Sequence, residues 1–256
     1  MRRPSGRRFN YLQGQSMIDL IQSAIDKNIE KKEREQKPRE YLGTSYVGER
    51  CSRKVQWTYQ NKPKDEGRNF TARVLRIFQR GHIMEDCVAE WFKGAGFILK
   101  TEKADGGQFG FASGNGRFRG HADGVFVGWK GSETSPMEVP ALWENKCLNS
   151  KNYKIVETKG IKIAKPTYYG QVQLYMYHLN LMDNPCVFST LNADTMELCI
   201  ELIPFDPEEC QRLIDKAVNI LQATDAGEVL PRIANDRNDF NCRFCDYQTQ
   251  CWEGAA

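Results

Sequence analysis

Two carboxylates and a lysine near the middle of the chain have the residue types and spacing of a metal-dependent hydrolytic site. Asp123 precedes the triplet Glu144-Asn145-Lys146. On a β-strand, Glu144 and Lys146 would point to one face, and a second strand could bring Asp123 beside them. Carboxylate oxygens bind hard cations such as Mg²⁺, and a neighbouring ammonium can hold a water or a phosphate oxygen. This set could hydrolyse a phosphodiester bond, although a cross-strand ion pair would use the same residues.

A predicted helix downstream carries two glutamines and two tyrosines at matching intervals. Gln173 and Tyr177 are four residues apart and share one helix face, and Gln171 and Tyr175 share a neighbouring face. Amides inside an otherwise apolar helix need hydrogen-bond partners, which the floor of a site would supply. We expect Gln173 and Tyr177 to be the pair that faces the carboxylates.

Three cysteines near the C-terminus, Cys242, Cys245 and Cys251, have the spacing C-x2-C-x5-C. This spacing suits a metal ion or an iron-sulfur cluster better than disulfides, because a reducing compartment keeps thiols free for coordination. A metal ion or cluster bound by these three cysteines would require a fourth ligand from elsewhere in the chain. We expect the remaining cysteines in helical or strand patterns to be small buried residues; they are Cys87, Cys147, Cys186, Cys199 and Cys210.

Hydrophobic periodicity predicts the elements that would position these side chains. Helices are predicted over residues 14–36, 51–57 and 70–95, the last of them broken or bent near Gly81, with a further helix starting at Asp206. Strands are predicted over residues 97–101, 117–127, 141–147, 186–191 and 196–203. The order indicates an α/β fold with a central mixed β-sheet flanked by helices.

Composition and charge narrow the class of protein. The chain has 256 residues, of which 40% are hydrophobic, and a net charge of +3. The first forty residues hold ten Lys or Arg against six Asp or Glu, so a basic tail and helix over residues 1–40 would precede a single domain over 41–256. No G-x4-G-K-[ST] loop is present, which argues against ATP-driven helicase activity. No membrane-spanning stretch is evident, and we expect a soluble, cytoplasmic protein.

Taken in order, these motifs resemble a known family. Gly81-x3-Glu85, Asp123, Glu144-x-Lys146 and Gln173-x3-Tyr177 are similar to the motif series of the PD-(D/E)XK nuclease superfamily, RecB-like branch, which includes phage-type exonucleases. Each motif is weak by itself, whereas their order over residues 51–251 is specific. The resemblance implies a restriction-endonuclease-like core.

The resemblance also implies roles for individual residues. Asp123, Glu144 and the carbonyl of Asn145 would bind Mg²⁺ or Mn²⁺, and Lys146 would orient the attacking water. Glu85 would be the carboxylate of the first motif. CRISPR-associated relatives usually have a histidine there, so His82, one helical turn away, is the alternative ligand. Gln173 and Tyr177 would orient DNA or the site residues.

Cys51 together with Cys242, Cys245 and Cys251 resembles the cysteine bracket of iron-sulfur members of the branch, among them AddB and CRISPR-associated RecB-like exonucleases. Shared ligation would close residues 41–69 and 225–256 into one cluster-binding lobe that joins the two ends of the chain. The resemblance favours a [4Fe-4S] cluster, and zinc remains the alternative because four thiolates suit both.

Basic and aromatic residues near the predicted site are candidates for DNA binding. The loop expected after the Glu144-Asn145-Lys146 strand is rich in lysine and includes Lys151 and Lys154, which would attract phosphates. Arg117 and Arg119 could join this rim, and Tyr168 could stack on a base. A solvated lysine loop would have the same composition.

The sequence thus predicts a Mg²⁺- or Mn²⁺-dependent DNA exonuclease acting on single strands or DNA ends. The expected setting is phage or prophage recombination, repair or DNA processing in a bacterial cell, with DNA as partner alongside a recombination or single-strand annealing protein. The alternatives are a nuclease that trims CRISPR spacer precursors and a non-catalytic DNA-end binding subunit stabilised by an iron-sulfur or zinc site.

Overall fold

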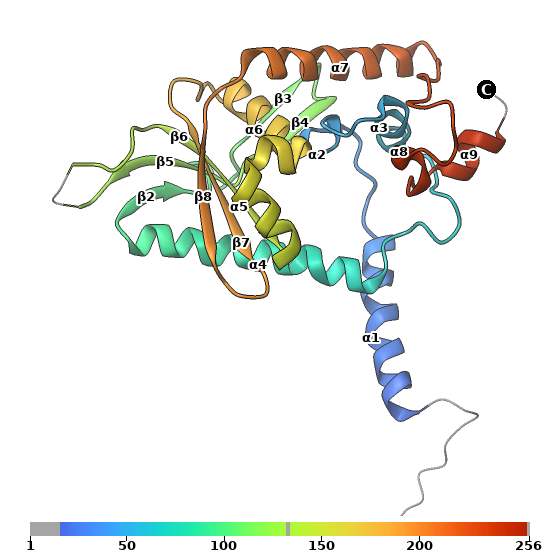
Figure 1. Ribbon diagram of the computed structural model, residues 1–256, viewed down its shortest axis with the longest axis horizontal. Coiled ribbons are helices and arrows are strands. Elements are labelled where there is room, and N and C mark those ends of the chain that lie inside the picture. Colours follow the sequence, from blue (N-terminus) through green and yellow to red (C-terminus); the bar gives the residue numbers. More distant parts are fainter. Residues whose placement is uncertain (1–15, 132–133, 255–256) are drawn as a thin grey trace, which may run out of the picture. The chain divides into compact units, whose positions relative to one another are not determined.

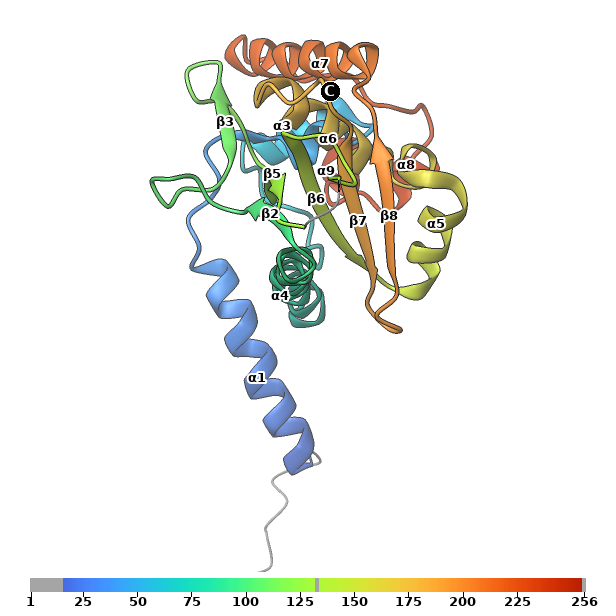
Figure 2. The same cartoon turned by 90° about the vertical axis from the view of Figure 1, so that its left-hand side faces the viewer.

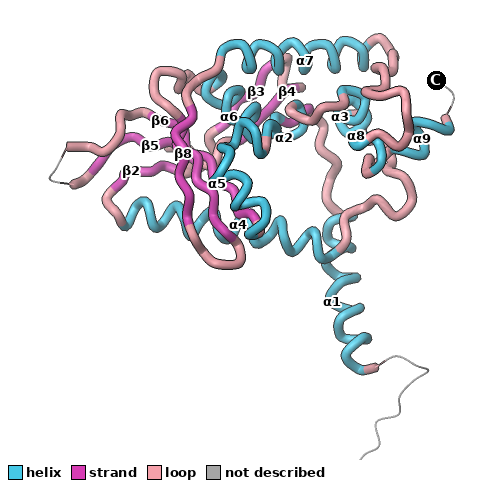
Figure 3. Tube along the Cα trace, in the orientation of Figure 1, coloured by secondary structure: helices cyan, strands magenta, loops and turns pink. Residues whose placement is uncertain are grey.

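The computed structural model describes residues 16–131 and 134–254 of the chain (Figures 1 and 3). Its helices are α1 Met17–Arg34, α2 Thr44–Val47, α3 Ser52–Tyr59, α4 Ala72–Gly94, α5 Ser150–Ala164, α6 Pro166–His178, α7 Pro207–Asp225, α8 Phe240–Arg243 and α9 Gln248–Glu253. Its strands are β1 Leu42–Gly43, β2 Phe97–Lys100, β3 Gly110–Ser113, β4 Phe118–His121, β5 Gly124–Trp129, β6 Ala141–Leu148, β7 Cys186–Asn192 and β8 Leu198–Ile203. None of the described helices is long and apolar enough to span a bilayer.

Residue contacts divide the described chain into two compact units. The first contains residues 16–37 and Phe70–Gln79, and the second contains Pro38–Asn69 and the described residues from Arg80 onward. In the first unit, Ser16 caps α1 by accepting a hydrogen bond from the backbone N–H of Asp19 at 3.1 Å. No side chain of α1 is buried. The predicted domain boundary at residue 40 and the predicted cluster-binding lobe stay predictions.

The second unit is built around a mixed five-stranded sheet in the order β2-β5-β6-β7-β8. Strands β6 and β7 are parallel, and the other neighbours are antiparallel. The parallel pair requires a crossover connection, which α5 and α6 supply. A smaller sheet in the order β1-β4-β3 packs against α6. The α/β fold with a mixed sheet and flanking helices is confirmed.

Helices cover both faces of the large sheet because β6 and β7 carry apolar side chains on both faces. On one face, Trp143 and Val187 pack against Val88 and Phe92 of α4. On the other face, Leu142 and Phe188 pack against α5 and α6. Helix α7 lies over α6 and α3 and buries a third apolar cluster, as Figure 2 shows from the side.

Several expected element boundaries were wrong. The strand predicted over residues 117–127 is two strands, because β4 pairs with β1 and β3 whereas β5 pairs with β2 and β6. Helix α4 continues through Gly81 without the expected break. The lysine-rich stretch expected as a loop forms α5, which kinks at Gly160, where φ is 72°. Among the cysteines expected to be buried, Cys186 and Cys210 are, whereas the other three are half-buried; these are Cys87, Cys147 and Cys199.

Candidate active site

In the large sheet, β5 stops pairing with β6 just before the Glu144-Asn145-Lys146 triplet. Strand β5 pairs with β6 only from Gly124, opposite Trp143, to Phe126. Beyond Trp143, β6 therefore has no β5 neighbour. Asp123 lies at the junction between β4 and β5. Its Oδ2 accepts a hydrogen bond from the backbone N–H of Asn145 at 2.8 Å, in place of a bond to a neighbouring strand. This hydrogen bond holds Asp123 beside β6, and it can form because β5 does not pair with β6 beyond Trp143.

Glu144 and Lys146 lie on one face of β6, as strand alternation predicts. The Lys146 ammonium donates to Glu144 Oε1 at 2.5 Å and to the Asn145 carbonyl at 3.0 Å. It lies 3.9 Å from Asp123 Oδ2. The Glu144 side chain is 1% exposed, and within the described residues its Oε2 has no hydrogen-bond partner. A buried carboxylate oxygen without a partner is costly, so this atom is available to a ligand.

Glu85 of α4 is the third carboxylate of the centre. Its charge interacts with those of Asp123 and Lys146, and Glu144 interacts with Glu85 and Asp123 in turn. His82 is oriented differently: its side chain is 83% exposed, and its Nδ1 lies 3.9 Å from Glu85 Oε2. Of the two alternatives for the first motif, Glu85 is the one that the structure brings to the carboxylates.

Burial and the neighbouring carboxylate charges shift the protonation of Glu85 and Glu144. Burial, followed by the charge of Asp123, raises the pKa of Glu144 to about 8 and that of Glu85 to about 7. Burial alone would lower the pKa of Lys146, but the charges of Glu144 and Asp123 outweigh it and raise that pKa. Lys146 therefore stays a cation, whereas Glu144 and Glu85 keep their protons to a higher pH than usual when no other cation is near.

The oxygen donors of this centre fit a hard divalent cation. Among the described residues, no group of three or more His, Cys, Asp or Glu side chains is arranged to hold a metal ion as it stands. However, the unpartnered Glu144 oxygen, the Asp123 carboxylate and the Asn145 carbonyl lie around Lys146, and Mg²⁺ prefers such oxygen ligands. The Asn145 side chain is itself anchored, because Ser189 donates to its Oδ1 at 2.8 Å.

The glutamine-tyrosine pair at the carboxylates is not the expected one. Gln173 turns away from the centre: it donates to the Pro204 carbonyl at 3.3 Å and accepts the backbone N–H of Asp206 at 2.7 Å. Tyr177 is 46% exposed. Tyr175, in contrast, is close enough to Glu144 and Lys146 to interact with their charges. The preference for Gln173 and Tyr177 is corrected by these contacts.

Tyr175 belongs to a buried network that includes Gln171, on the same face of α6, and Thr44, from a segment more than a hundred residues earlier. Its hydroxyl accepts hydrogen bonds from Gln171 Nε2 at 2.7 Å and from Thr44 Oγ1 at 3.0 Å. Gly120 of β4 permits this approach, because a Cβ there would lie 2.5 Å from Tyr175 Cε1. Burial and the charge of Glu144 raise the pKa of Tyr175, so the hydroxyl keeps its proton and can donate it in a hydrogen bond.

The candidate DNA-binding residues differ in whether their side chains already contact other residues of the protein. The Lys146 ammonium lies 5.5 Å from the ring centroid of Tyr168, which places Tyr168 at the centre. Arg117 forms two 2.8 Å hydrogen bonds with Asp225, and Lys154 pairs with Glu157 at 2.6 Å. Arg119 lies 5.2 Å from the ring of Tyr41. Lys151 is exposed on α5. Their roles in binding DNA stay predictions.

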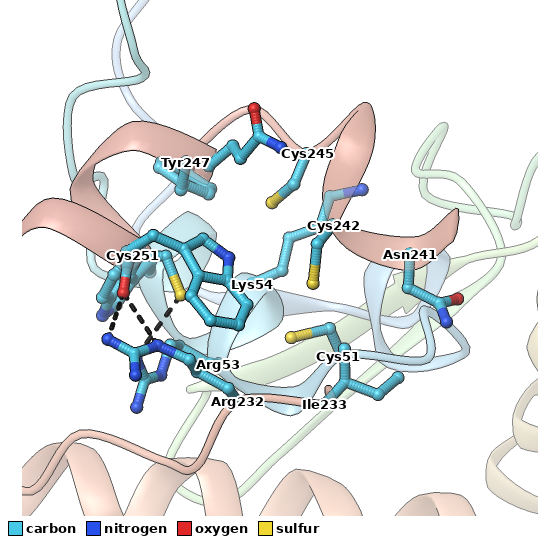
Figure 4. A pocket seen from close by; sticks show the side chains of 13 residues that line it. Cys51, Arg53, Lys54, Arg232, Ile233, Asn241, Cys242, Cys245, Tyr247 and Cys251 are labelled. Atoms are coloured by element: carbon cyan, nitrogen blue, oxygen red, sulfur yellow. Dashed lines mark hydrogen bonds between the residues drawn. The ribbon is translucent and has the colours of Figure 1, made fainter. Parts of the chain in front are cut away.

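The four cysteines of the predicted bracket line one pocket. Cys51 precedes α3, and the other three come from the segment that contains α8 and α9, so residues from both ends of the second unit meet here. The pocket is partly open to solvent, and the empty space in and in front of it amounts to about 340 Å³. Figure 4 shows the sulfur atoms of Cys51, Cys242, Cys245 and Cys251 directed toward the same space. All four are free thiols, and the absence of a group of side chains arranged to hold a metal ion as it stands, among the described residues, includes these four.

Solved structures with a similar fold include two forms of one exonuclease. No protein-family model matches the sequence, and no curated protein matches it. The alkaline exonuclease LHK-Exo from Laribacter hongkongensis is 17% identical, with a TM-score of 0.50, over 73% of this chain and 89% of that one. The same exonuclease in complex with dAMP gives the same values. A protein named SSO0001 is 15% identical over 92% of this chain and 98% of that one, with a TM-score of 0.49.

At 17% identity, the likeness to LHK-Exo concerns the fold. This chain therefore has the α/β fold of an alkaline exonuclease.

Proposed function

We propose that this protein is a divalent-metal-dependent deoxyribonuclease of the PD-(D/E)XK type that removes nucleotides from DNA ends. The observation that carries the proposal is the unpartnered, buried Oε2 of Glu144, which lies in a group of three interacting carboxylates beside Lys146. Acids gathered in this way without a cation repel one another, and the pKa values of Glu144 and Glu85, raised by burial and by the charge of Asp123, express that cost. A bound cation would remove it.

Each residue has a defined part in the proposed reaction. A Mg²⁺ or Mn²⁺ ion held by Glu85, Asp123, Glu144 and the Asn145 carbonyl would supply Lewis acidity and a water of lowered pKa. The Lys146 ammonium would orient the attacking water and stabilise the negative charge that develops on the phosphate. Lys146 suits this role because its raised pKa keeps it charged.

Residues around the centre would position the substrate. The Tyr175 hydroxyl, fixed by Gln171 and Thr44, would donate to a phosphate oxygen or keep the carboxylates in place. Tyr168, whose ring contacts Lys146, would stack on a base or sugar of the strand being cut. Arg119, Lys151 and the other cations would attract the DNA backbone.

The cysteine pocket is proposed to hold a structural [4Fe-4S] cluster, with zinc as the alternative. Four thiols directed into one pocket support either centre. Ligation would tie the chain before α3 to the segment after α7, and its contribution would be to stability. The proposed setting, phage recombination or repair with a recombination or annealing protein as partner, rests on the family resemblance.

An end-labelled DNA assay tests the proposed activity and its direction together. Full-length protein purified under anaerobic conditions is incubated with single- and double-stranded DNA labelled at either end, with Mg²⁺ or Mn²⁺. We expect nucleotides to be released only with a divalent cation. Asp123→Asn and Lys146→Met should abolish release, whereas the matched surface variants Asp183→Asn and Lys130→Met should keep it.

Wild-type protein that binds DNA but degrades it no faster than Asp123→Asn would refute the enzyme proposal. That result would instead support the non-catalytic DNA-end binding subunit.

A further inference from the structure

Arg53 is a buried arginine at the wall of the cysteine pocket. It lies in the first turn of α3, two residues after Cys51, and is 9% exposed. Its Nε donates to the Leu230 carbonyl at 2.5 Å, and one terminal nitrogen donates to Cys251 Sγ at 3.4 Å. Figure 4 shows this contact on the side of Cys251 that faces away from Cys242. The guanidinium thus joins α3, the loop before α8 and one cysteine sulfur.

The surroundings of Arg53 leave its charge without a carboxylate partner. No acidic side chain of the described residues lies within salt-bridge distance of it, and its aromatic neighbour, Trp57, is uncharged. Burying an unpaired guanidinium is expensive, because an arginine cannot discharge itself by losing a proton. The neighbouring group that can become an anion is the Cys251 thiol, which is a thiolate when it binds a metal.

A second arginine fixes the backbone of the same cysteine. Arg232 donates from two nitrogens to the Cys251 carbonyl, at 2.9 and 2.5 Å, and lies 4.8 Å from the ring of Trp252. Of the four pocket cysteines, Cys251 is the one for which the described residues provide an arginine at both the sulfur and the carbonyl.

We propose that Arg53 is a positioning residue of the metal-thiolate centre: its N–H···S hydrogen bond holds the Cys251 thiolate in place as the fourth ligand and balances part of the charge of the four thiolates. The inference rests on the proposed cysteine site and is independent of the nuclease activity. It applies to an iron-sulfur cluster and to zinc, because four thiolates around either centre keep a net negative charge.

The rate of metal loss tests this role. Anaerobically purified full-length protein is mixed with excess chelator, and release is followed by loss of iron-thiolate absorbance or by a zinc-sensitive dye. Arg53→Gln should release its metal about 10 to 100 times faster than wild type, the usual effect of removing a hydrogen bond to a ligand. Arg53→Lys, which keeps the charge but not the geometry, should be intermediate. Arg243→Gln, which changes an exposed arginine at the end of α8, is the matched control.

A double-variant comparison separates positioning from a merely structural role. If Arg53 acts through the Cys251 sulfur, then Arg53→Gln should accelerate release strongly in wild type and hardly at all in Cys251→His, which keeps a metal ligand at this position without a thiolate. An equal acceleration in both backgrounds, or release from Arg53→Gln at the wild-type rate, would overturn the proposal. In an iron-containing protein, Arg53→Gln should also shift the reduction equilibrium about tenfold toward the oxidised state, about 59 mV for one electron.

Metal analysis of the wild type distinguishes the two levels of failure. Protein that holds neither iron nor zinc would overturn the cysteine site and this inference together. Protein that holds metal but loses it at the same rate with Arg53→Gln overturns the role of Arg53 alone.

Discussion

The carboxylate centre and the cysteine pocket both gather side chains suited to metal ions, but the chain holds them in different ways. Asp123, Glu144 and Lys146 come from within 24 residues of one another and are fixed by a strand and the hydrogen bond from Asn145 N–H to Asp123. Cys51 and Cys242 are separated by 190 residues. Sheet pairing therefore positions the first set, whereas the second set depends on helices of four to eight residues, α3, α8 and α9, and on the loops between them.

This difference predicts different consequences of damage. Loss of a carboxylate would abolish the proposed nuclease activity but leave the protein folded, because the pairing of the strands does not depend on the carboxylate charge. Loss of a cysteine ligand would remove a link between distant segments and so lower the stability of the protein. The molecules that remain folded would keep their nuclease activity. Four experiments would break or sharpen the comparison.

The largest effect is expected from Glu144→Gln. The change keeps the shape of the side chain but removes the charge that would bind the cation, a contribution of several kcal/mol to transition-state stabilisation. Nuclease turnover per folded molecule should therefore fall about a thousandfold or more. Cys251→Ser, measured in the same assay, should stay within about tenfold of wild type. Equal losses in the two variants would show that the centres are not separate.

The second experiment removes the metal of the cysteine pocket. Cys242→Ser should lose iron or zinc and a few kcal/mol of stability, which lowers the melting temperature by about ten degrees for a chain of this size. Differential scanning calorimetry and metal analysis measure both. Cys199→Ser, at the half-buried cysteine of edge strand β8, should keep both the metal and the melting temperature.

A smaller effect is expected from the two tyrosines of α6. Tyr175→Phe removes a hydroxyl that is bonded to Gln171 and Thr44 next to Glu144, and should lower kcat about tenfold, the equivalent of one hydrogen bond. Tyr177→Phe removes an exposed hydroxyl and should leave kcat unchanged. The reverse order would restore Gln173 and Tyr177 as the functional pair.

The smallest effect is a dependence of stability on pH that arises in the carboxylate centre. The pKa of Glu144 is raised from its ordinary value of 4.5 to about 8, so the folded protein without a divalent cation holds a proton that the unfolded chain would lose. This contribution to stability is complete below about pH 4.5 and is lost as the pH rises through about 8. Thermal melts without added cation should show a decline over this window, and Glu144→Gln should reduce it.

Mg²⁺ provides the control for the pH experiment. Added cation should raise the melting temperature most at the alkaline end of the range, where it competes with the fewest protons. An unchanged slope in Glu144→Gln would mean that other groups produce the pH dependence.

The sequence predicted the carboxylate centre well where local geometry decides it. Strand alternation placed Glu144 and Lys146 together, and the contact is found. The position of Asp123 was not predictable in the same way, because the run from Arg117 to Val127 reads as one strand. The run is nevertheless divided between two sheets, because β4 pairs with β1 and β3 whereas β5 pairs with β2 and β6.

The choice between the two glutamine-tyrosine pairs was beyond the sequence for a different reason. Helix α6 is buried on every side from Tyr169 to Met176, so its pattern does not mark the face that points to the site. The roles of Thr44 and Arg53 were equally hidden, since each acts on a residue more than a hundred positions away. The grouping of Cys51 with the C-terminal cysteines came from family resemblance and not from spacing.

The central claim, that Asp123, Glu144 and Glu85 form a divalent-cation site beside Lys146, is tested most directly by Mn²⁺ binding. In a titration followed by the electron paramagnetic resonance signal of free Mn²⁺, wild-type protein and Asp183→Asn should bind the ion with the same affinity. Asp123→Asn and Glu144→Gln should bind it at least about a hundredfold more weakly, the loss expected when a ligand is worth about 3 kcal/mol. Equal Mn²⁺ affinity in all four proteins would contradict the account.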